Sequence, residues 1–172
     1  MKLWPSDRFE IETAMSPEEI ASLLNSQIAP RRWRMYGSPE KAFVGAASPT
    51  GFAIAGNTQY RNSFNPWIRG TFRPGPSGTT VSIQMGLYPL TMAFMWFWFC
   101  GLGLTVLFLV ASLFSEQGGA NPLSLAIPLA LAAAGWALMS CGFWYEATRQ
   151  RARLLDLFRT EGAEKPAQGP PA

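Results

Sequence analysis

The stretch LTMAFMWFWFCGLGLTVLFLVASLF, residues 90–114, decides the architecture of this 172-residue chain. It contains 25 consecutive residues without Asp, Glu, Lys or Arg. As an α-helix it would be roughly 37 Å long, whereas the hydrocarbon core of a bilayer is about 30 Å thick. We therefore predict that residues 90–114 form a transmembrane helix.

A second uncharged run, LSLAIPLALAAAGWALMSCGFWY, covers residues 123–145 and predicts a second span. Between the two runs, residues 115–122 (SEQGGANP) are rich in turn-forming residues, and so short a connection makes the helices antiparallel neighbours. Pro128 is expected to bend the second helix. We thus expect a transmembrane hairpin over residues 89–146.

Small residues in the spans allow close helix contact, which is the main packing device in lipid. We expect them to pack the two spans together, or to join copies of the protein into a homo-oligomer. These residues are Gly101, Gly103, Ala126, Ala130, Ala133, Ala134 and Ala137.

The charges that flank the spans predict their orientation. The linker at 115–122 contains no Lys or Arg, whereas Arg149, Arg151 and Arg153 follow the second run. Because basic flanks stay on the cytoplasmic side, we expect a multi-pass protein of the bacterial inner (plasma) membrane with both termini in the cytoplasm.

Residues 1–88 predict a cytoplasmic α+β domain. Ser16, Pro17 and Glu19 have the spacing of a helix capping box, and an apolar stripe at helical spacing follows them. We expect this helix to pack on one antiparallel sheet, which would bury enough apolar surface for independent folding. Alternating apolar and polar residues predict strands at 9–13, 42–46, 52–55, 67–73 and 79–87.

The segment 147–172 follows the second span. An apolar stripe beside the arginines, made of Ala147, Leu154, Leu155 and Phe158, predicts a basic amphipathic helix that could lie along the membrane surface. Residues 162–172 are rich in Pro and Gly, and we expect them to be a disordered tail.

Several classes of function are disfavoured by composition. The chain has no His, and its two cysteines, Cys100 and Cys141, both lie in the apolar runs, so we expect no metal site, no cofactor and no catalytic site. A net charge of +3, dispersed along the chain, predicts no nucleic-acid binding. Spans without an ionisable residue disfavour a transporter. We therefore expect a protein that is not an enzyme.

Two groups of basic residues are candidates for contact with anionic lipid headgroups or with a protein partner, since each basic residue near such a surface contributes about 1 kcal/mol. The first surrounds a tryptophan and the second follows the hairpin. They are Arg31, Arg32, Trp33 and Arg34, and Arg149, Arg151 and Arg153.

The run YRNSFNPWIRG at 60–70, followed by Gly78-Thr79 and a strand leading into an aromatic-rich span, resembles a family of small uncharacterised bacterial membrane proteins. That resemblance covers about residues 40–100 and implies a cytoplasmic α+β domain ahead of two C-terminal transmembrane helices. Within the run, Asn62, Ser63 and Asn65 either close turns by bonding nearby backbone groups or form a ligand loop.

Our leading hypothesis is a membrane-anchored module that binds a protein partner or the inner headgroup surface. The alternative is a lipid- or small-molecule-binding domain with a pocket between helix and sheet, lined by Ile20, Leu24, Phe52 or Phe72. A third and weaker candidate is an oligomeric pore. A filled core favours the first hypothesis, and an enlarged cavity favours the second.

Overall fold

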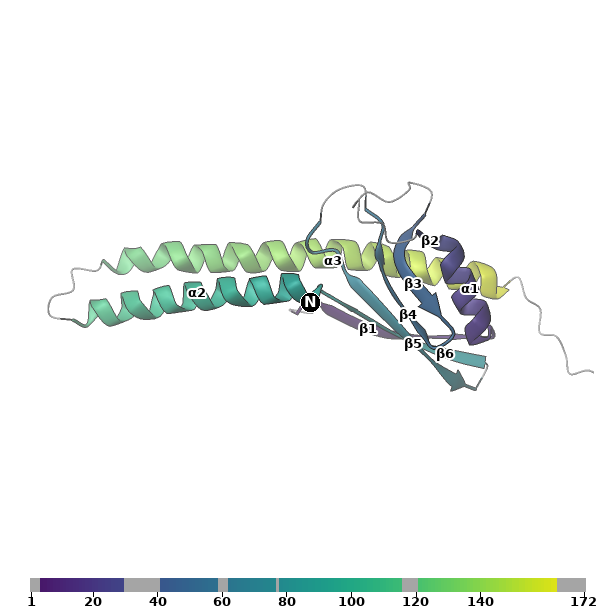
Figure 1. Cartoon of the computed structure of the whole chain (residues 1–172). Coiled ribbons are helices and arrows are strands. Elements are labelled where there is room, and N and C mark those ends of the chain that lie inside the picture. The colour runs from purple at the N-terminus through teal and green to yellow at the C-terminus, as the bar shows by residue number, and fades with distance from the viewer. Residues whose placement is uncertain (1–3, 30–40, 59–61, 77, 116–120, 164–172) are drawn as a thin grey trace, which may run out of the picture.

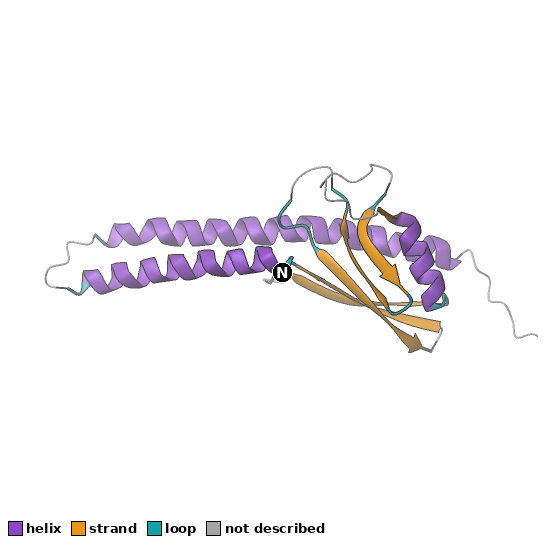
Figure 2. Ribbon diagram, in the orientation of Figure 1, coloured by secondary structure: helices purple, strands orange, loops and turns teal. Residues whose placement is uncertain are grey.

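The computed structural model describes residues 4–29, 41–58, 62–76, 78–115 and 121–163, and it confirms the α+β class with a helical hairpin. The strands are β1 (Ser6–Thr13), β2 (Ile28–Ala29), β3 (Phe43–Ser48), β4 (Gly51–Gly56), β5 (Trp67–Gly75) and β6 (Gly78–Gly86). The helices are α1 (Pro17–Gln27), α2 (Pro89–Leu113), the 3₁₀ turn η1 (Pro122–Leu125) and α3 (Ala126–Ala163). Figures 1 and 2 show a sheet at one end of a long two-helix rod.

The six strands form one sheet in the order β1-β6-β5-β4-β3-β2. Neighbours are antiparallel except for β2 and β3, which are parallel. Successive side chains alternate between the two faces. One face, which we call the inner face, packs against α1 and α3, and the opposite face, the outer face, has no layer over it among the described residues.

The capping box forms as predicted at the start of α1. The Glu19 N–H donates to Ser16 Oγ (3.2 Å), and the Ser16 N–H donates to Glu19 Oε2 (2.9 Å). These bonds satisfy two backbone donors that the helix itself leaves open. They fix the start of α1 so that Ile20 and Leu24 are fully buried against the inner face.

Both edges of the sheet are protected against pairing with another strand. At one edge, the Asn25 side chain donates to the Ala47 carbonyl (3.0 Å) and accepts from the Ala47 N–H (3.3 Å), so that an amide side chain takes the place of a neighbouring strand. At the other edge, β1 exposes Arg8, Glu10 and Glu12. Charged side chains of this kind discourage edge-to-edge association.

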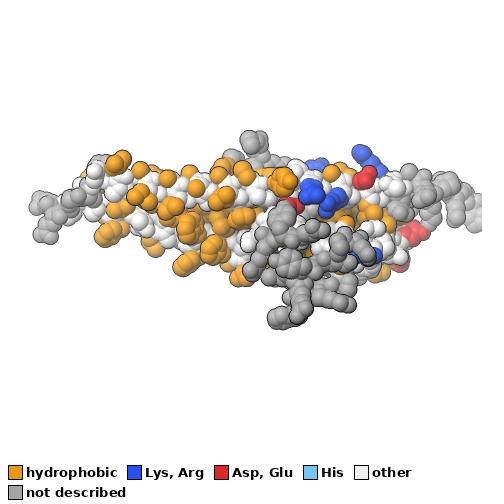
Figure 3. Space-filling model, turned by 90° about the horizontal axis from the view of Figure 1, so that it is seen from above, with side chains coloured by type: hydrophobic (Ala, Val, Ile, Leu, Met, Phe, Trp, Pro, Cys, Tyr) orange, Lys and Arg blue, Asp and Glu red, His pale blue; other side chains and the backbone are white. Residues whose placement is uncertain are grey.

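The rod consists of α2 and the first half of α3. Only 6% of the most apolar 18-residue window of α2 is buried inside the protein, and 17% of that of the second helix. A core helix of a soluble protein would be mostly buried. These two helices are long and apolar enough to cross a membrane, and their apolar side chains are mostly exposed. Figure 3 shows the apolar surface of this rod.

The second half of α3 differs from its sequence-based prediction. Ala147, Leu154 and Phe158 do not lie along a membrane surface; they are buried, with 1%, 0% and 5% exposure, in the core against the inner face. Residues 1–88 therefore lack part of their own core, because α3 supplies the layer that covers the sheet. An amphipathic stripe fits a protein core as well as a lipid surface, and here the sheet is the partner.

Two further expectations for the spans are corrected. Pro128 lies in the first turn of α3, where no intrahelical donor is needed, and does not interrupt the helix. The small residues contribute less to the hairpin than expected, since Ala130, Ala133 and Ala137 are exposed and a Cβ on Gly101 would meet nothing within 4 Å. Among the span glycines, Gly135 alone has a contact from the other helix: its Cβ would lie 3.2 Å from Trp98 Nε1.

Candidate functional site

Arg151 joins the edge strand β1 to α3. Its Nη1 donates to Asp7 Oδ2 at 3.1 Å, and its guanidinium carbon lies 4.5 Å from the centre of the Phe9 ring. The Asp7 side chain is 4% exposed, so this carboxylate depends on partners within the protein. Arg151 was a candidate for headgroup contact, but in the structure it forms an ion pair with Asp7 that links β1 to α3.

The candidate ligand loop closes turns instead of lining a cavity. Asn62 Oδ1 accepts from the Phe64 N–H (2.9 Å), which is the local turn expected of Asn. The Ser63 carbonyl accepts from Thr91 Oγ1 of α2 (3.0 Å). Phe64 itself packs at Gly142 of α3, where a Cβ would lie 3.0 Å from the ring.

Asn65 extends this loop into a buried polar contact with α3. Its Nδ2 donates to the Gly56 carbonyl (2.8 Å), and its Oδ1 accepts from Gln150 Nε2 (2.6 Å). Gln150 is 1% exposed, and a Cβ at Gly56 would lie 2.2 Å from Gln150 Nε2, so a larger residue at this position would displace the Gln150 amide. The loop therefore contacts both long helices, α2 and α3.

Arg149 and Arg153 are exposed on α3, beyond the end of the apolar rod. At ~1.5 Å per residue they lie roughly 6 Å and 12 Å past Tyr145 along the helix. Figure 3 shows Lys and Arg side chains gathered where the apolar rod meets the domain. Arg31, Arg32, Trp33 and Arg34 lie outside the described residues.

Buried apolar side chains pack between the sheet and its helices. Ile20, Leu24 and Phe52, which were expected to line a pocket if one existed, belong to one buried cluster with Leu154 and Phe158 of α3. Phe52 also lies across Gly70, where a Cβ would be 2.1 Å from the ring. Three of the four residues that were expected to line such a pocket are therefore buried in the core.

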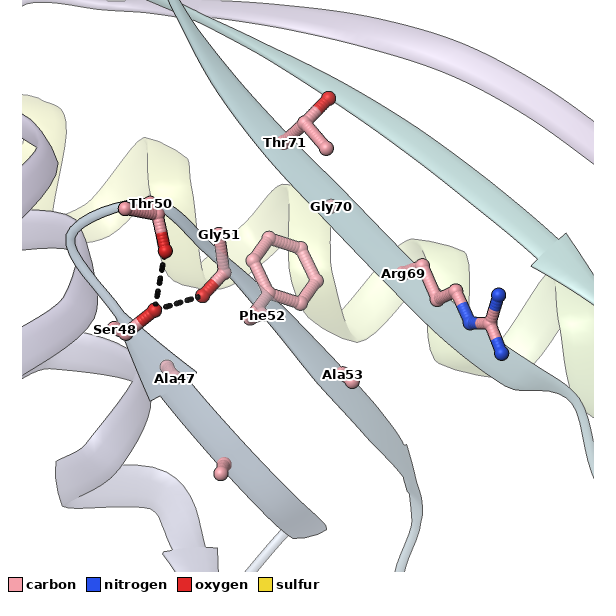
Figure 4. Close-up of a pocket in the computed structure, with 10 residues that line it drawn as sticks. Ala47, Ser48, Thr50, Gly51, Phe52, Ala53, Arg69, Gly70 and Thr71 are labelled. Atoms are coloured by element: carbon pink, nitrogen blue, oxygen red, sulfur yellow. Dashed lines mark hydrogen bonds between the residues drawn. The ribbon is translucent and has the colours of Figure 1, made fainter.

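The outer face carries an open depression of about 410 Å³ over β3, β4 and β5. Figure 4 shows the residues that line it. By strand alternation, five of these residues place their side chains on the outer face: Ala46, Ser48, Ala53, Arg69 and Thr71. The lining is mostly apolar, with Arg69 on one side and Ser48 and Thr50 on the other.

Arg69 is the charged residue of this depression, whose lining is otherwise mostly apolar. Arg69 is exposed, and no carboxylate of a described residue lies within ion-pair distance of it. On the opposite rim, Ser48 Oγ lies 2.9 Å from Thr50 Oγ1 and donates to the Gly51 carbonyl (3.1 Å), so the turn is already ordered. Sequence reasoning missed this site because its residues come from three strands whose register was not known.

Within the part of the chain that the structure describes, no cluster of three or more His, Cys, Asp or Glu side chains could hold a metal ion. Cys100 and Cys141 are both free thiols at exposed positions on the rod.

The site therefore belongs to an α+β domain that carries two helices long and apolar enough to cross a membrane. The inner face is closed by α1 and α3, and the outer face is open. The resemblance noted above for residues 40–100 stays an expectation. No protein-family model, curated protein or solved structure matches the chain.

Proposed function

We propose that this chain is a membrane-anchored, non-catalytic binding module of the bacterial inner membrane. The hairpin holds the domain at the cytoplasmic surface, and the outer face binds a protein partner. The observation that carries this proposal is the filled inner face beside an open outer face with its depression at Arg69.

The orientation rests on the flanking charges. Arg149 and Arg153 are exposed at the end of the rod that joins the domain, whereas the linker between the helices has no Lys or Arg. Translocating basic residues is unfavourable, so the domain stays in the cytoplasm.

The test is a photo-cross-linking residue placed at Thr71, in the depression, in cells that express the intact protein. We expect an adduct with one defined protein, and we expect Arg69→Glu to remove it. The matched control is the same cross-linker at Ala152, which is exposed on α3. Equal adducts at both positions, or none at Thr71, would contradict the proposal.

A second candidate function is headgroup contact, which the exposure of Arg149 and Arg153 favours. Each would contribute about 1 kcal/mol of attraction to an anionic surface. In nanodiscs, anionic lipid should then raise the melting temperature of the intact protein relative to zwitterionic lipid. Arg149→Gln with Arg153→Gln should abolish that difference, and an unchanged difference would exclude this role.

A further inference from the structure

Two exposed tyrosines lie at one level along the rod, where it meets the domain. A Cβ at Gly135 of α3 would lie 3.2 Å from Trp98 Nε1 of α2, so these two residues are at the same height. Tyr88 comes ten residues before Trp98, and Tyr145 comes ten residues after Gly135. Because the helices are antiparallel, each tyrosine lies ~15 Å from this contact, in the direction of the domain. Their exposed fractions are 41% for Tyr88 and 66% for Tyr145.

The length of the rod assigns this level to the lipid headgroups. α2 has 25 residues, which corresponds to roughly 37 Å of helix. The hydrocarbon core of a bilayer is about 30 Å thick, and the bilayer with its headgroup regions is about 40–45 Å thick. A centred rod therefore extends ~3–4 Å beyond the hydrocarbon at each end. Tyr88 and Tyr145 then lie among the headgroups, where Tyr and Trp are enriched because their rings are apolar and their tips are polar.

The loop at 62–66 reaches still closer to the centre of the bilayer. The Ser63 carbonyl accepts from Thr91 Oγ1 of α2. Phe64 packs at Gly142 of α3. Thr91 and Gly142 each lie three residues nearer to the bilayer centre than the two tyrosines, which is ~4.5 Å along a helix. Two contacts, one with each long helix, therefore bring this part of the domain to the edge of the hydrocarbon.

The start of β1 adds an exposed tryptophan at the same end of the domain. Ser6 pairs with Gly86, three residues before α2 begins, and Figure 1 shows the start of β1 beside the start of α2. Trp4 accepts a backbone hydrogen bond from the Ser6 N–H (2.8 Å), and its side chain is 53% exposed. On β5, Trp67 also pairs with Gly86, and its ring meets the Tyr88 ring edge-on, with 5.9 Å between the centres. The sheet thus ends in aromatic side chains where it meets the rod.

We propose that this end of the domain is immersed in the headgroup layer of the inner leaflet, through Trp4, Tyr88, Tyr145 and the loop at 62–66. A lipid interface fits this surface because the surface continues the apolar rod, offers amphipathic aromatic rings and is built from residues without charge. The inference rests on the proposed function, since it requires that the hairpin spans the membrane. It adds that the sheet itself contacts lipid, so the domain is held at one height and does not swing on a tether.

The test measures the depth of single cysteines in the full-length protein, in phosphatidylcholine nanodiscs, after Cys100→Ala and Cys141→Ala. Trp4→Cys and Ser63→Cys each carry an environment-sensitive fluorophore, and a lipid with a nitroxide on its headgroup acts as the quencher. The Ser63 side chain is exposed, and the contact with α2 uses its carbonyl, so the label leaves that contact in place. We expect strong quenching at both positions.

Two further positions calibrate the measurement. Leu90→Cys, in the first turn of α2, should be quenched as strongly as the two test positions. Thr160→Cys is the matched control on α3; it is exposed and lies roughly 22 Å beyond Tyr145, so it should not be quenched.

A third position separates this proposal from the proposed function. Leu104→Cys, in the middle of α2, should be quenched by a nitroxide placed halfway along the acyl chain. If it is, but Trp4→Cys or Ser63→Cys is quenched no more than Thr160→Cys, the immersion of the domain is overturned and the proposed function stands. If Leu104→Cys is not quenched, the membrane anchor is refuted, and both proposals fail with it.

Discussion

Replacing Leu154 with Ala tests whether the second half of α3 belongs to the core of the domain. Leu154 is 0% exposed and belongs to the same cluster as Phe52 and Ile68 of the sheet. The substitution removes three carbon groups at about 0.8 kcal/mol each and leaves a cavity, so we expect a loss of roughly 3–4 kcal/mol. This is a large part of the ~5–15 kcal/mol that stabilises a typical domain.

The assay is thermal unfolding of the full chain in mild detergent, with the unfolded fraction of the domain measured by pulse proteolysis. At about 4–8 °C per kcal/mol for a domain of this size, the melting temperature should fall by at least about 12 °C. The matched control is Arg153→Ala on the preceding, exposed position, which should change stability by less than about 0.5 kcal/mol. An equal, small effect of both substitutions would mean that the stripe packs on lipid and would refute the reasoning.

Three further predictions concern the folding of the domain, the membrane topology and the ion pair between Arg151 and Asp7. Residues 1–88 alone should fail to fold, because the core lacks Phe143, Leu154 and Phe158, and well-dispersed amide resonances from this fragment would contradict this. In a background of Cys100→Ala and Cys141→Ala, Gln117→Cys should react with an impermeant maleimide added to intact cells, whereas Thr160→Cys should react only after lysis; the reverse pattern would invert the topology. Arg151→Ala should destabilise the domain by roughly 1.5–3 kcal/mol, because the buried Asp7 loses a charged hydrogen-bond partner, whereas Arg149→Ala should have little effect in the same melt.

The local elements follow closely from the sequence. The capping box at Ser16 and Glu19 depends on side chains that are three residues apart and needs no tertiary contact. The strands from β3 to β6 follow the alternation of apolar and polar residues between turns. The two long apolar helices follow from runs without charge that are long enough to cross a membrane.

The candidate site was predicted only in part. Arg149 and Arg153 are exposed, and their contact with headgroups or a partner stays a prediction. Asn62 closes a turn, which is one of the two interpretations that the sequence left open. The depression at Arg69 was not foreseen, because its side chains become neighbours only through the register of β3, β4 and β5.

The two apolar helices, the short connection that makes them antiparallel, and the capped helix with its alternating strands can all be predicted from the sequence, because each depends on residues close together in the chain. Tertiary structure alone decided where the stripe of Ala147, Leu154 and Phe158 is buried and that Arg151 binds Asp7. An apolar stripe lowers its free energy equally well against lipid or against a sheet. Only the position of the sheet beside α3 selects between them.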